Sequence, residues 1–252
     1  MKANATLKND FVLQRLDKAN EVINQFIKSC SHSMRGPMKS IKGLVGLVRG
    51  LHPDDTNAEM LTGLIDKTVN NMEKMLDELE HFMINSDKIL ETREVNVAPL
   101  INRLVNNFKK EKQAPPITWT VMVGQPVRFR TDPGRLQLAL SHLLSNAITF
   151  QRQQNSNKRI TIRAVINEEE CKIQIEDNGI GLPEKERENI FRLFYRASQQ
   201  SSGAGVGLFV VHEVLEKIGG QVLVTAATGG GSLFELTIPN RYKKSDSTVK
   251  AN

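Results

Sequence analysis

Asp177-Asn178-Gly179-Ile180-Gly181 follows the alternating, strand-like run from Lys172 to Glu176, and a second glycine cluster, Gly203-Ala204-Gly205-Val206-Gly207, opens a helix-like apolar pattern. A carboxylate at the end of a strand can accept a hydrogen bond from an adenine amino group. Glycines let main-chain N–H groups approach phosphates at the start of a helix. Either stretch alone is a weak signal, because glycine-rich loops are common turns. Their order behind the polar Asn146 and the unusual His32 indicates a nucleotide pocket.

The composition is that of a globular protein. With 252 residues, of which 39% are hydrophobic and 25% charged, the chain can form one large domain or two modest ones. Its formal charge of +6 is dispersed, and only two Tyr and one Trp are available to stack on bases, so nucleic-acid binding is disfavoured. Cys30 and Cys171 show no CxxC spacing and lie in apolar contexts, which favours buried thiols in a reducing compartment.

No apolar run approaches the ~20 residues that span a bilayer, and the N-terminus lacks the apolar segment of a secretory signal. We therefore expect a soluble, cytoplasmic segment that makes no membrane contact of its own. This expectation does not exclude a longer, membrane-bound parent protein. The polar tail at 243–252 is expected to fray.

The first part of the chain predicts two long amphipathic helices. From Val12, apolar or small residues recur in alternating steps of four and three, as in a heptad seam, and the pattern persists to Val48. Helix-breaking residues at 50–55 separate it from a second helix, about Thr56 to Leu90. Such a hairpin has too much apolar surface to bury alone, and a homodimeric four-helix bundle is the simplest solution. The alternative is that the hairpin packs against the rest of the same chain.

After Arg93, strand-like and helix-like patterns alternate. The expected strands are Val95–Val97, Ile117–Val123, Val127–Thr131, Arg159–Asn167, Cys171–Glu176, Val222–Ala226 and Ser232–Ile238. The expected helices are Pro99–Lys112, Pro133–Gln151, Pro183–Phe194 and Val206–Ile218. The strands pair too locally for a doubly wound parallel sheet, so we predict an α+β fold with a two-layer sandwich of mixed sheet and helices. The domains would be the helical hairpin at 1–92, the sandwich at 93–242 and the tail at 243–252.

His32 lies in the first predicted helix but off its apolar seam. Pro37, five residues later, removes an N–H donor and clashes with the preceding turn, at a cost on the order of 3 kcal/mol. A helix defect beside a solvent-facing imidazole requires a functional reason.

At this point the chain resembles the sensor histidine kinases over nearly its whole length. Their phosphoacceptor motif is similar to Ser31-His32-x-x-Arg35-x-Pro37, and their phenylalanine box is similar to Ile190-Phe191-x-x-Phe194-Tyr195-Arg196. Their asparagine box is similar to Asp132-x-x-Arg135-Leu136-Gln137 with Leu143-Leu144-Ser145-Asn146-Ala147, and their glycine boxes to Asp177–Gly181, Gly203–Leu208 and Gly229–Phe234. The order and approximate spacing of these motifs make the resemblance highly specific.

The resemblance implies a dimerisation and phosphotransfer hairpin followed by a Bergerat-type ATP-binding domain. Asp177 would accept a hydrogen bond from the adenine amino group, Asn146 would ligate Mg²⁺ through its carbonyl oxygen, and Phe150 would lie beside the adenine. The segment from Tyr195 to Gly203 would close over ATP as a lid, with Arg196 either at the γ-phosphate or in solvent. The other nucleotide-binding positions would be Gly179, Gly181, Gly203, Gly205, Gly207 and Leu208.

The implied reaction is attack of a His32 ring nitrogen on the γ-phosphorus of ATP, which yields phosphohistidine and ADP. The phosphoryl group would then pass to an aspartate of a response-regulator receiver domain. Mg²⁺ and positioning supply most of the catalysis in such transfers.

Several positions depart from the family pattern. The usual acidic residue after the histidine is Ser33, a poor base, so we expect slow or context-dependent autophosphorylation. Gly36 stands where members that dephosphorylate their partner often carry an amide or hydroxyl residue, so phosphatase activity is not expected. In the asparagine box, Thr149 replaces the usual lysine, and Arg152 is a candidate to replace the lost cation.

His142 replaces the usual first asparagine of the same box. It lies four residues before Asn146 and therefore on the same helix face. Two interpretations stay open, a place at the metal or phosphate site and a merely packed or solvated side chain.

Two other function classes are compatible with parts of the pattern. A degenerate kinase could bind nucleotide, dimerise and signal by association alone. An ATP-driven conformational clamp on the same ATPase fold is disfavoured, because such proteins lack the histidine hairpin in front.

Overall fold

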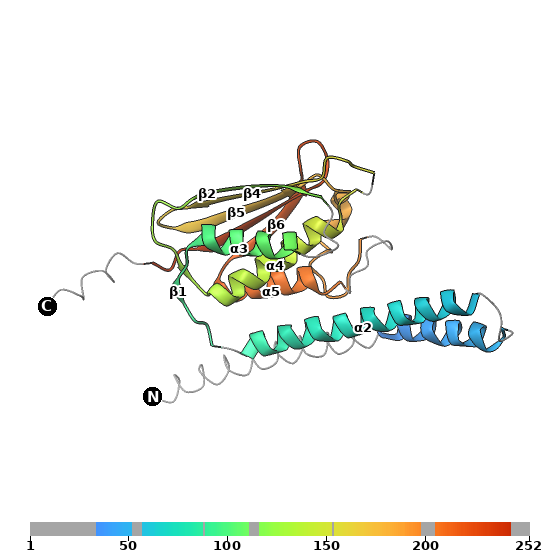
Figure 1. The fold of residues 1–252 in the computed structure, drawn as a ribbon. Helices are drawn as coiled ribbons and strands as arrows, with labels where there is room; N and C mark the ends of the chain where they lie inside the picture. The colour runs from blue at the N-terminus through green and yellow to red at the C-terminus, as the bar shows by residue number, and fades with distance from the viewer. Residues whose placement is uncertain are drawn as a thin grey trace, which may run out of the picture. The chain divides into compact units, whose positions relative to one another are not determined.

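The computed structural model describes residues 34–51, 57–87, 89–110, 116–152, 154–197 and 205–242 (Figure 1). The chain divides into two compact units, Met1–Leu76 and Asp77–Asn252. Within the described residues the first unit is helical, and the second contains every strand.

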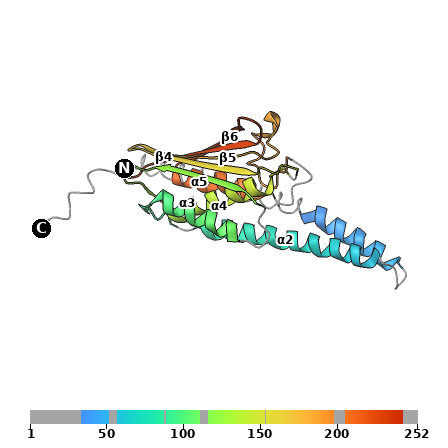
Figure 2. The same ribbon diagram turned by 45° about the horizontal axis from the view of Figure 1, so that its top comes forward.

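The first unit has a helix at 34–49 and most of helix α2, Asn57–Asp87. The two helices lie side by side and run in opposite directions (Figures 1 and 2), so the predicted hairpin is confirmed for these residues. Leu61 of α2 is buried, whereas Met60 and Leu64 of the same helix are 59% and 43% exposed. Of the helix break predicted at 50–55, Gly50 and Leu51 form a turn and a bend, and the remaining residues lie outside the described part of the chain. The predicted phosphoacceptor His32 also lies outside it.

The second unit contains a mixed five-stranded sheet in the order β2-β4-β5-β7-β6. Strands β2 and β4 pair in parallel, and the other neighbours pair antiparallel. The strands are β2 Thr118–Gly124, β4 Arg159–Ile166, β5 Glu170–Asp177, β6 Gln221–Ala226 and β7 Ser232–Pro239. A separate antiparallel pair joins β1, Arg93–Glu94, to β3, Arg130–Thr131.

Three helices cover one face of this sheet (Figures 1 and 2). They are α3 Val97–Lys110, α4 Pro133–Thr149 and α5 Gly207–Ile218. The arrangement is the predicted two-layer sandwich of a mixed sheet and helices, and it sets the carboxyl end of α4 near the end of β5.

The core follows from the alternating pattern of the strands. Along β5, every second residue from Cys171 to Asp177 is buried, because successive side chains point to opposite faces. The other face carries cross-strand pairs, including Arg163 with Glu176 at 2.7 Å. One face of the sheet is therefore sealed against the helices, and the other face is polar.

The start of α4 is fixed by Asp132. This residue caps the helix: its Oδ1 accepts a hydrogen bond from the main-chain N–H of Arg135 at 3.0 Å, and its Oδ2 accepts from that residue's guanidinium at 2.5 Å. Its Oδ2 also accepts from the N–H of Glu91 at 3.1 Å. Burial raises the pKa of Asp132, but these hydrogen bonds outweigh it, and the pKa is lowered overall.

Three predicted elements differ from the structure. The helix expected at Pro183–Phe194 is wrong, because only a 3₁₀ turn forms, at Glu184–Glu186. The N–H groups of Arg187, Asn189 and Arg192 donate three residues back. The run Glu184 to Glu188 is charged throughout, so it offers no apolar stripe whose packing could propagate an α-helix.

The other two differences lie at element boundaries. Val97, expected to end a strand, begins helix α3, and the preceding strand is shifted to Arg93–Glu94. The strand expected at Val127–Thr131 contains only Arg130 and Thr131. These two strands pair with each other, and their ladder is two residues long.

Candidate nucleotide-binding site

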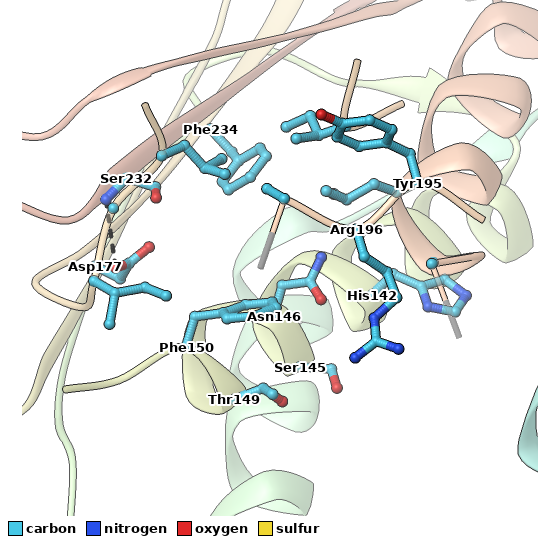
Figure 3. Close-up of a pocket in the computed structure, with 18 of the residues that line it drawn as sticks. His142, Ser145, Asn146, Thr149, Phe150, Asp177, Tyr195, Arg196, Ser232 and Phe234 are labelled. Atoms are coloured by element: carbon cyan, nitrogen blue, oxygen red, sulfur yellow. Dashed lines mark hydrogen bonds between the residues drawn. The ribbon is translucent and has the colours of Figure 1, made fainter. Parts of the chain in front are cut away.

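A cavity of about 420 Å³ opens between α4, the start of α5 and the loops that follow β5 (Figure 3). Its volume lies in the range of sites for small molecules and cofactors, roughly 300 to 1,000 Å³. Its polar lining includes His142, Ser145, Asn146, Thr149, Asp177, Arg196 and Ser232, and its apolar lining includes Phe150, Ile180, Leu182, Ile190 and Phe234.

Asp177 ends strand β5 at one end of the cavity, and only 5% of it is exposed. Its Oδ1 accepts hydrogen bonds from the N–H of Gly179 at 2.8 Å and of Ser232 at 3.4 Å. Burial raises the pKa of the carboxyl to about 6, although the two hydrogen bonds oppose this shift. Among the described contacts, both donors reach Oδ1, so Oδ2 is the oxygen left to accept a hydrogen bond from a ligand.

The chain approaches itself so closely around Asp177 that only glycine fits at two positions. A Cβ on Gly179 would lie 2.2 Å from the carbonyl oxygen of Phe150, and a Cβ on Gly231 would lie 2.0 Å from that of Asp177. The N–H of Ile180 donates to the carbonyl of Phe150 at 3.0 Å. The first glycine loop is thereby held against the end of α4, and it forms a cradle that a side chain would fill.

Helix α4 supplies one wall of the cavity. His142, Asn146 and Phe150 are four residues apart and line it from successive turns of one helix face. His142 lies next to α5, since a Cβ on Gly207 would be 3.1 Å from its Nδ1. Asn146 is half-buried, with its amide at the cavity between Asp177 and Arg196 (Figure 3).

The start of α5 closes the other end. Gly207 and Leu208 line the cavity there, and the N-cap residue Val206 has no side chain that could satisfy the first N–H groups of the helix. Such a helix start favours an anion, because its N–H groups and its dipole both present positive charge.

A main-chain hydrogen bond joins Phe194 to Gly205, the two ends of the segment between them. The N–H of Phe194 donates to the carbonyl of Gly205 at 2.7 Å. Gly205 has φ +73°, and a Cβ there would lie 2.8 Å from the carbonyl oxygen of Tyr195. The hydroxyl of Tyr195 donates a hydrogen bond to the carboxylate of Glu186, which raises the pKa of the phenol.

Most of the predicted site residues lie around this one cavity. Asn146, Phe150, Asp177, Gly181, Arg196, Gly205, Gly207 and Leu208 all line it. Gly179 lies behind the lining and shapes it, whereas His32 and Gly203 lie outside the described residues. Of the apolar lining, the sequence predicted only Phe150. It did not single out Ile180, Ile190 and Phe234, although these residues lie inside the quoted motifs.

Arg152 does not line the cavity. Its Nε donates to the carbonyl of Gly179 at 2.9 Å, and its Nη2 lies 3.1 Å from the position of a Cβ on Gly230. The predicted replacement for the lysine lost at Thr149 therefore binds the glycine loop, on the outer side of the cradle.

The donor set fits a nucleotide with a hard cation. A buried carboxylate suits an adenine amino group, and the helix start suits phosphates. The amide oxygen of Asn146 is a ligand of the type that Mg²⁺ accepts alongside phosphate oxygens. Among the described residues of the lining, Asp177 is the only carboxylate.

Comparison with known proteins agrees with this chemistry. Residues 131–242 match the family described as histidine kinase-, DNA gyrase B-, and HSP90-like ATPase. The chain is 26% identical over 228 residues to the methanogenesis regulatory histidine kinase FilI of Methanothrix harundinacea, and 29% identical over 237 residues to the aerobic respiration control sensor protein ArcB of Escherichia coli. Residues 131–242 form a domain of this ATPase family, and the chain that contains it is similar to sensor histidine kinases.

The alignments extend beyond this ATPase domain on the chain but cover only part of the relatives. They span 89% and 88% of the chain, and 25% of FilI and 29% of ArcB. The solved structure of the histidine kinase ThkA in complex with the response regulator protein TrrA shares the fold, with a TM-score of 0.65 and 21% identity over 83% of this chain and 59% of that one.

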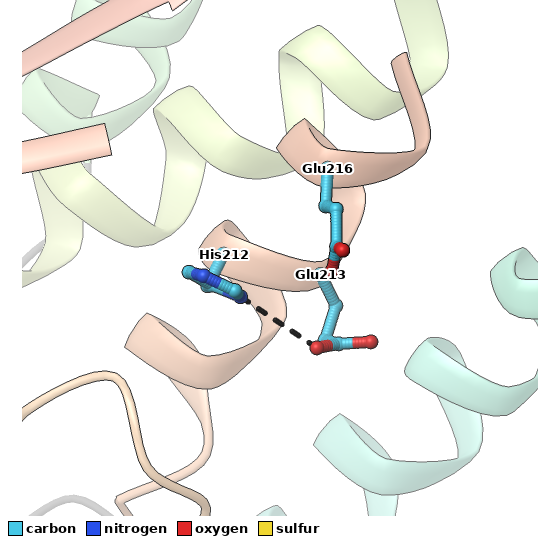
Figure 4. Close-up of side chains that lie close together, drawn as sticks. All are labelled: His212, Glu213 and Glu216. Atoms are coloured by element: carbon cyan, nitrogen blue, oxygen red, sulfur yellow. Dashed lines mark ion pairs between the residues drawn. The ribbon is translucent and has the colours of Figure 1, made fainter. Parts of the chain in front are cut away.

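The ATPase domain carries a second group of possible metal ligands, on the surface of α5 (Figure 4). His212, Glu213 and Glu216 have ligand atoms within 4.8 Å of one another. All three project from one helix, and the Nδ1 of His212 lies 3.6 Å from the carboxylate of Glu213. Exposed acidic groups of this kind are common on helices, and we assign no site to them.

None of the described helices has the length and apolar character needed to cross a bilayer.

Proposed function

We propose that the chain is the autophosphorylating core of a two-component histidine kinase, which works in the cytoplasm. In this proposal, residues 1–92 dimerise and carry the phosphoacceptor His32, residues 93–242 bind ATP, and residues 243–252 are a flexible tail. The observation that carries the proposal is the single cavity lined by the buried carboxylate of Asp177, the amide of Asn146 and the start of α5.

Asp177 recognises the adenine. Its carboxylate accepts a hydrogen bond from the adenine amino group while Gly179 and Ser232 hold it in place through Oδ1. Phe150 and Phe234 lie on either side of this part of the cavity and offer apolar surface to the ring (Figure 3). A buried acceptor rejects bases without a matching donor, because the carboxylate would then stay desolvated and unpaired.

The phosphates lie toward the start of α5, where the N–H groups near Gly207 and Leu208 face them. The carbonyl oxygen of Asn146 would hold Mg²⁺, which would neutralise phosphate charge when bound. Arg196 lines the cavity at this end and adds positive charge.

A His32 ring nitrogen then attacks the γ-phosphorus. The N–P bond forms as the bond from the γ-phosphorus to the bridging oxygen breaks, and ADP leaves with the electron pair. The imidazole becomes cationic and must release the proton on its other nitrogen. Ser33 is a poor base for that proton, and loss of a general base typically slows a reaction by about 10²- to 10⁴-fold.

The phosphoryl group passes from His32 to an aspartate of a response-regulator receiver domain. The relationship to sensor kinases and the fold shared with ThkA, which was solved with a response regulator, support this assignment. The exposed apolar side chains of α2 support the homodimer.

Incubation of the purified chain with γ-labelled ATP and Mg²⁺ tests the proposal. We expect acid-labile label on the wild type and on His212→Ala, an exposed histidine outside the cavity, but none on His32→Ala or Asn146→Ala. Ser33→Glu should speed the labelling. Nucleotide binding without label would instead indicate a nucleotide-binding signalling partner, and steady hydrolysis without label would indicate an ATP-driven clamp.

A further inference from the structure

The side chain of His142 is a nitrogen ligand at a site that otherwise offers oxygen. It lies one helical turn before Asn146 on the face of α4 that lines the cavity. Residues four apart on a helix are neighbours, about 5 to 6 Å between their Cβ atoms. The amide oxygen of Asn146 and an imidazole nitrogen of His142 can therefore reach the same ion.

The surroundings of His142 point to the phosphate end of the cavity. Its Nδ1 lies 3.1 Å from the position that a Cβ on Gly207 would occupy, so the ring packs against the first residue of α5. Figure 3 shows His142 and Arg196 together at the end of the cavity away from Asp177. An imidazole in this place lies beside whatever the start of α5 binds.

The rest of the lining limits which groups can bind a cation there. Asp177 is the only carboxylate among the described lining residues, and it lies at the other end. Apart from the hydroxyls of Ser145 and Thr149, the side-chain ligands for a cation at the phosphate end are the amide oxygen of Asn146 and the imidazole of His142. Phosphate oxygens and water would complete the shell.

An imidazole nitrogen beside an amide oxygen changes which metal the site prefers. Mg²⁺ takes oxygen ligands in strict octahedral geometry, whereas imidazole suits transition metals. Mn²⁺ accepts carbonyl and phosphate oxygens as Mg²⁺ does, and it also accepts imidazole nitrogen. We infer that His142 is a metal ligand that shifts the preference of this nucleotide site from Mg²⁺ toward Mn²⁺. The inference rests on the proposed function, because the nucleotide supplies the remaining ligands.

The test measures binding, with a non-hydrolysable ATP analogue added to the full chain in Mg²⁺, in Mn²⁺ or in chelator. We expect wild type to bind the analogue more tightly in Mn²⁺ than in Mg²⁺ by about tenfold, the lower end of what loss of a group supporting a metal site costs. His142→Asn, which restores an amide, should remove most of this difference. His142→Gln, an amide on a longer side chain, should do the same, and His212→Asn should keep the wild-type ratio.

Paramagnetic resonance of the bound Mn²⁺ gives a direct readout. A nitrogen coupling should be present in wild type and His212→Asn, and absent in His142→Asn. Equal loss of affinity in both metals, without nitrogen coupling in wild type, would show that His142 contacts phosphate and would overturn the inference while leaving the nucleotide site intact. Absence of binding in every metal would overturn both this inference and the proposed function.

Discussion

At the scale of single residues, Asp177 combines recognition with a cost to stability. Burial raises the pKa of its carboxyl to about 6, so the group is neutral at low pH and charged at neutral pH. The adenine amino group is a donor and needs the charged form as its acceptor. We therefore expect adenosine to bind fully above pH 7 and its affinity to fall below pH 6, by up to about tenfold per pH unit.

Adenosine is the appropriate probe because it carries no phosphates that titrate in the same range. Glu235→Gln is the matched control, since this carboxylate lies on the outer face of the sheet and pairs with Lys172. A pH profile that is flat between 5 and 7, or one that changes with Glu235→Gln, would contradict the assignment to Asp177.

The same shift predicts a trade-off in the ligand-free domain. A carboxyl whose folded pKa exceeds its unfolded value stabilises the fold at low pH, and this contribution is lost as pH rises through the folded pKa. The shift from 3.8 to about 6 corresponds to about 3 kcal/mol at pH 8. Asp177→Asn should therefore lose adenosine binding yet raise the free energy of unfolding in urea at pH 8, by up to that amount, with no gain at pH 4.

Arg152 shows how a charged residue near a nucleotide can act without touching it. Its Nε donates to the carbonyl of Gly179 and so holds the cradle beside Asp177. A hydrogen bond of this kind contributes about 1 kcal/mol, so Arg152→Ala should weaken nucleotide binding by about fivefold. The loss should be equal for adenosine and for ATP, and Arg152→Lys should not restore it. A loss confined to ATP, rescued by lysine, would mean that the charge attracts phosphates.

At the scale of elements, the turn that precedes α5 depends on Gly205. Gly205→Ala would place a Cβ 2.7 Å from the backbone of Phe194 at a φ of +73°. Gly229 is a matched control, because its φ is +89° but nothing lies within 4 Å of a Cβ there. Both variants carry the backbone strain, about 1 kcal/mol or more, and only Gly205→Ala adds the clash. We expect a clearly lower melting temperature and weaker ATP binding for Gly205→Ala than for Gly229→Ala, and equal effects would contradict this account.

Elements with a strong hydrophobic periodicity were predictable from the sequence, and elements without such a periodicity were not. The alternation in Cys171–Glu176 and the helical stripe of Val206–Ile218 correspond to β5 and α5, because each buries one face against the other layer. The charged run at 184–188 has no such face, although the expected helix begins at the proline before it. The proline only begins a 3₁₀ turn.

The site was predictable where chemistry resides in local motifs. Asp177 and Gly179 sit next to each other in sequence, and their hydrogen bond is local. The contact of Arg152 with the glycine loop and the contact of His142 with Gly207 join segments far apart in the chain. Such contacts depend on how α4 packs against its neighbours, which no spacing in the sequence specifies.

At the scale of the whole molecule, the proposed dimer follows from apolar surface that one chain leaves in water. On the helix at 34–49 and on α2, Met38, Leu47, Met60 and Leu64 are 43% to 59% exposed. Burying a leucine contributes about 2 kcal/mol, and a two-fold interface buries each position twice. Leu64→Glu should thus weaken dimerisation by roughly 4 kcal/mol or more, about a thousandfold in Kd.

Sedimentation equilibrium of the full chain measures this change. Wild type should be a dimer, and Leu64→Glu should be a monomer at the same concentration. Val165→Glu is the control, because Val165 is 62% exposed on strand β4 of the other unit and should leave the dimer unchanged. Since Asp177 and Asn146 lie within one unit, the Leu64→Glu monomer should still bind ATP. A monomeric wild type would refute the bundle, whereas a Leu64→Glu monomer that loses ATP binding would show that the two units depend on each other.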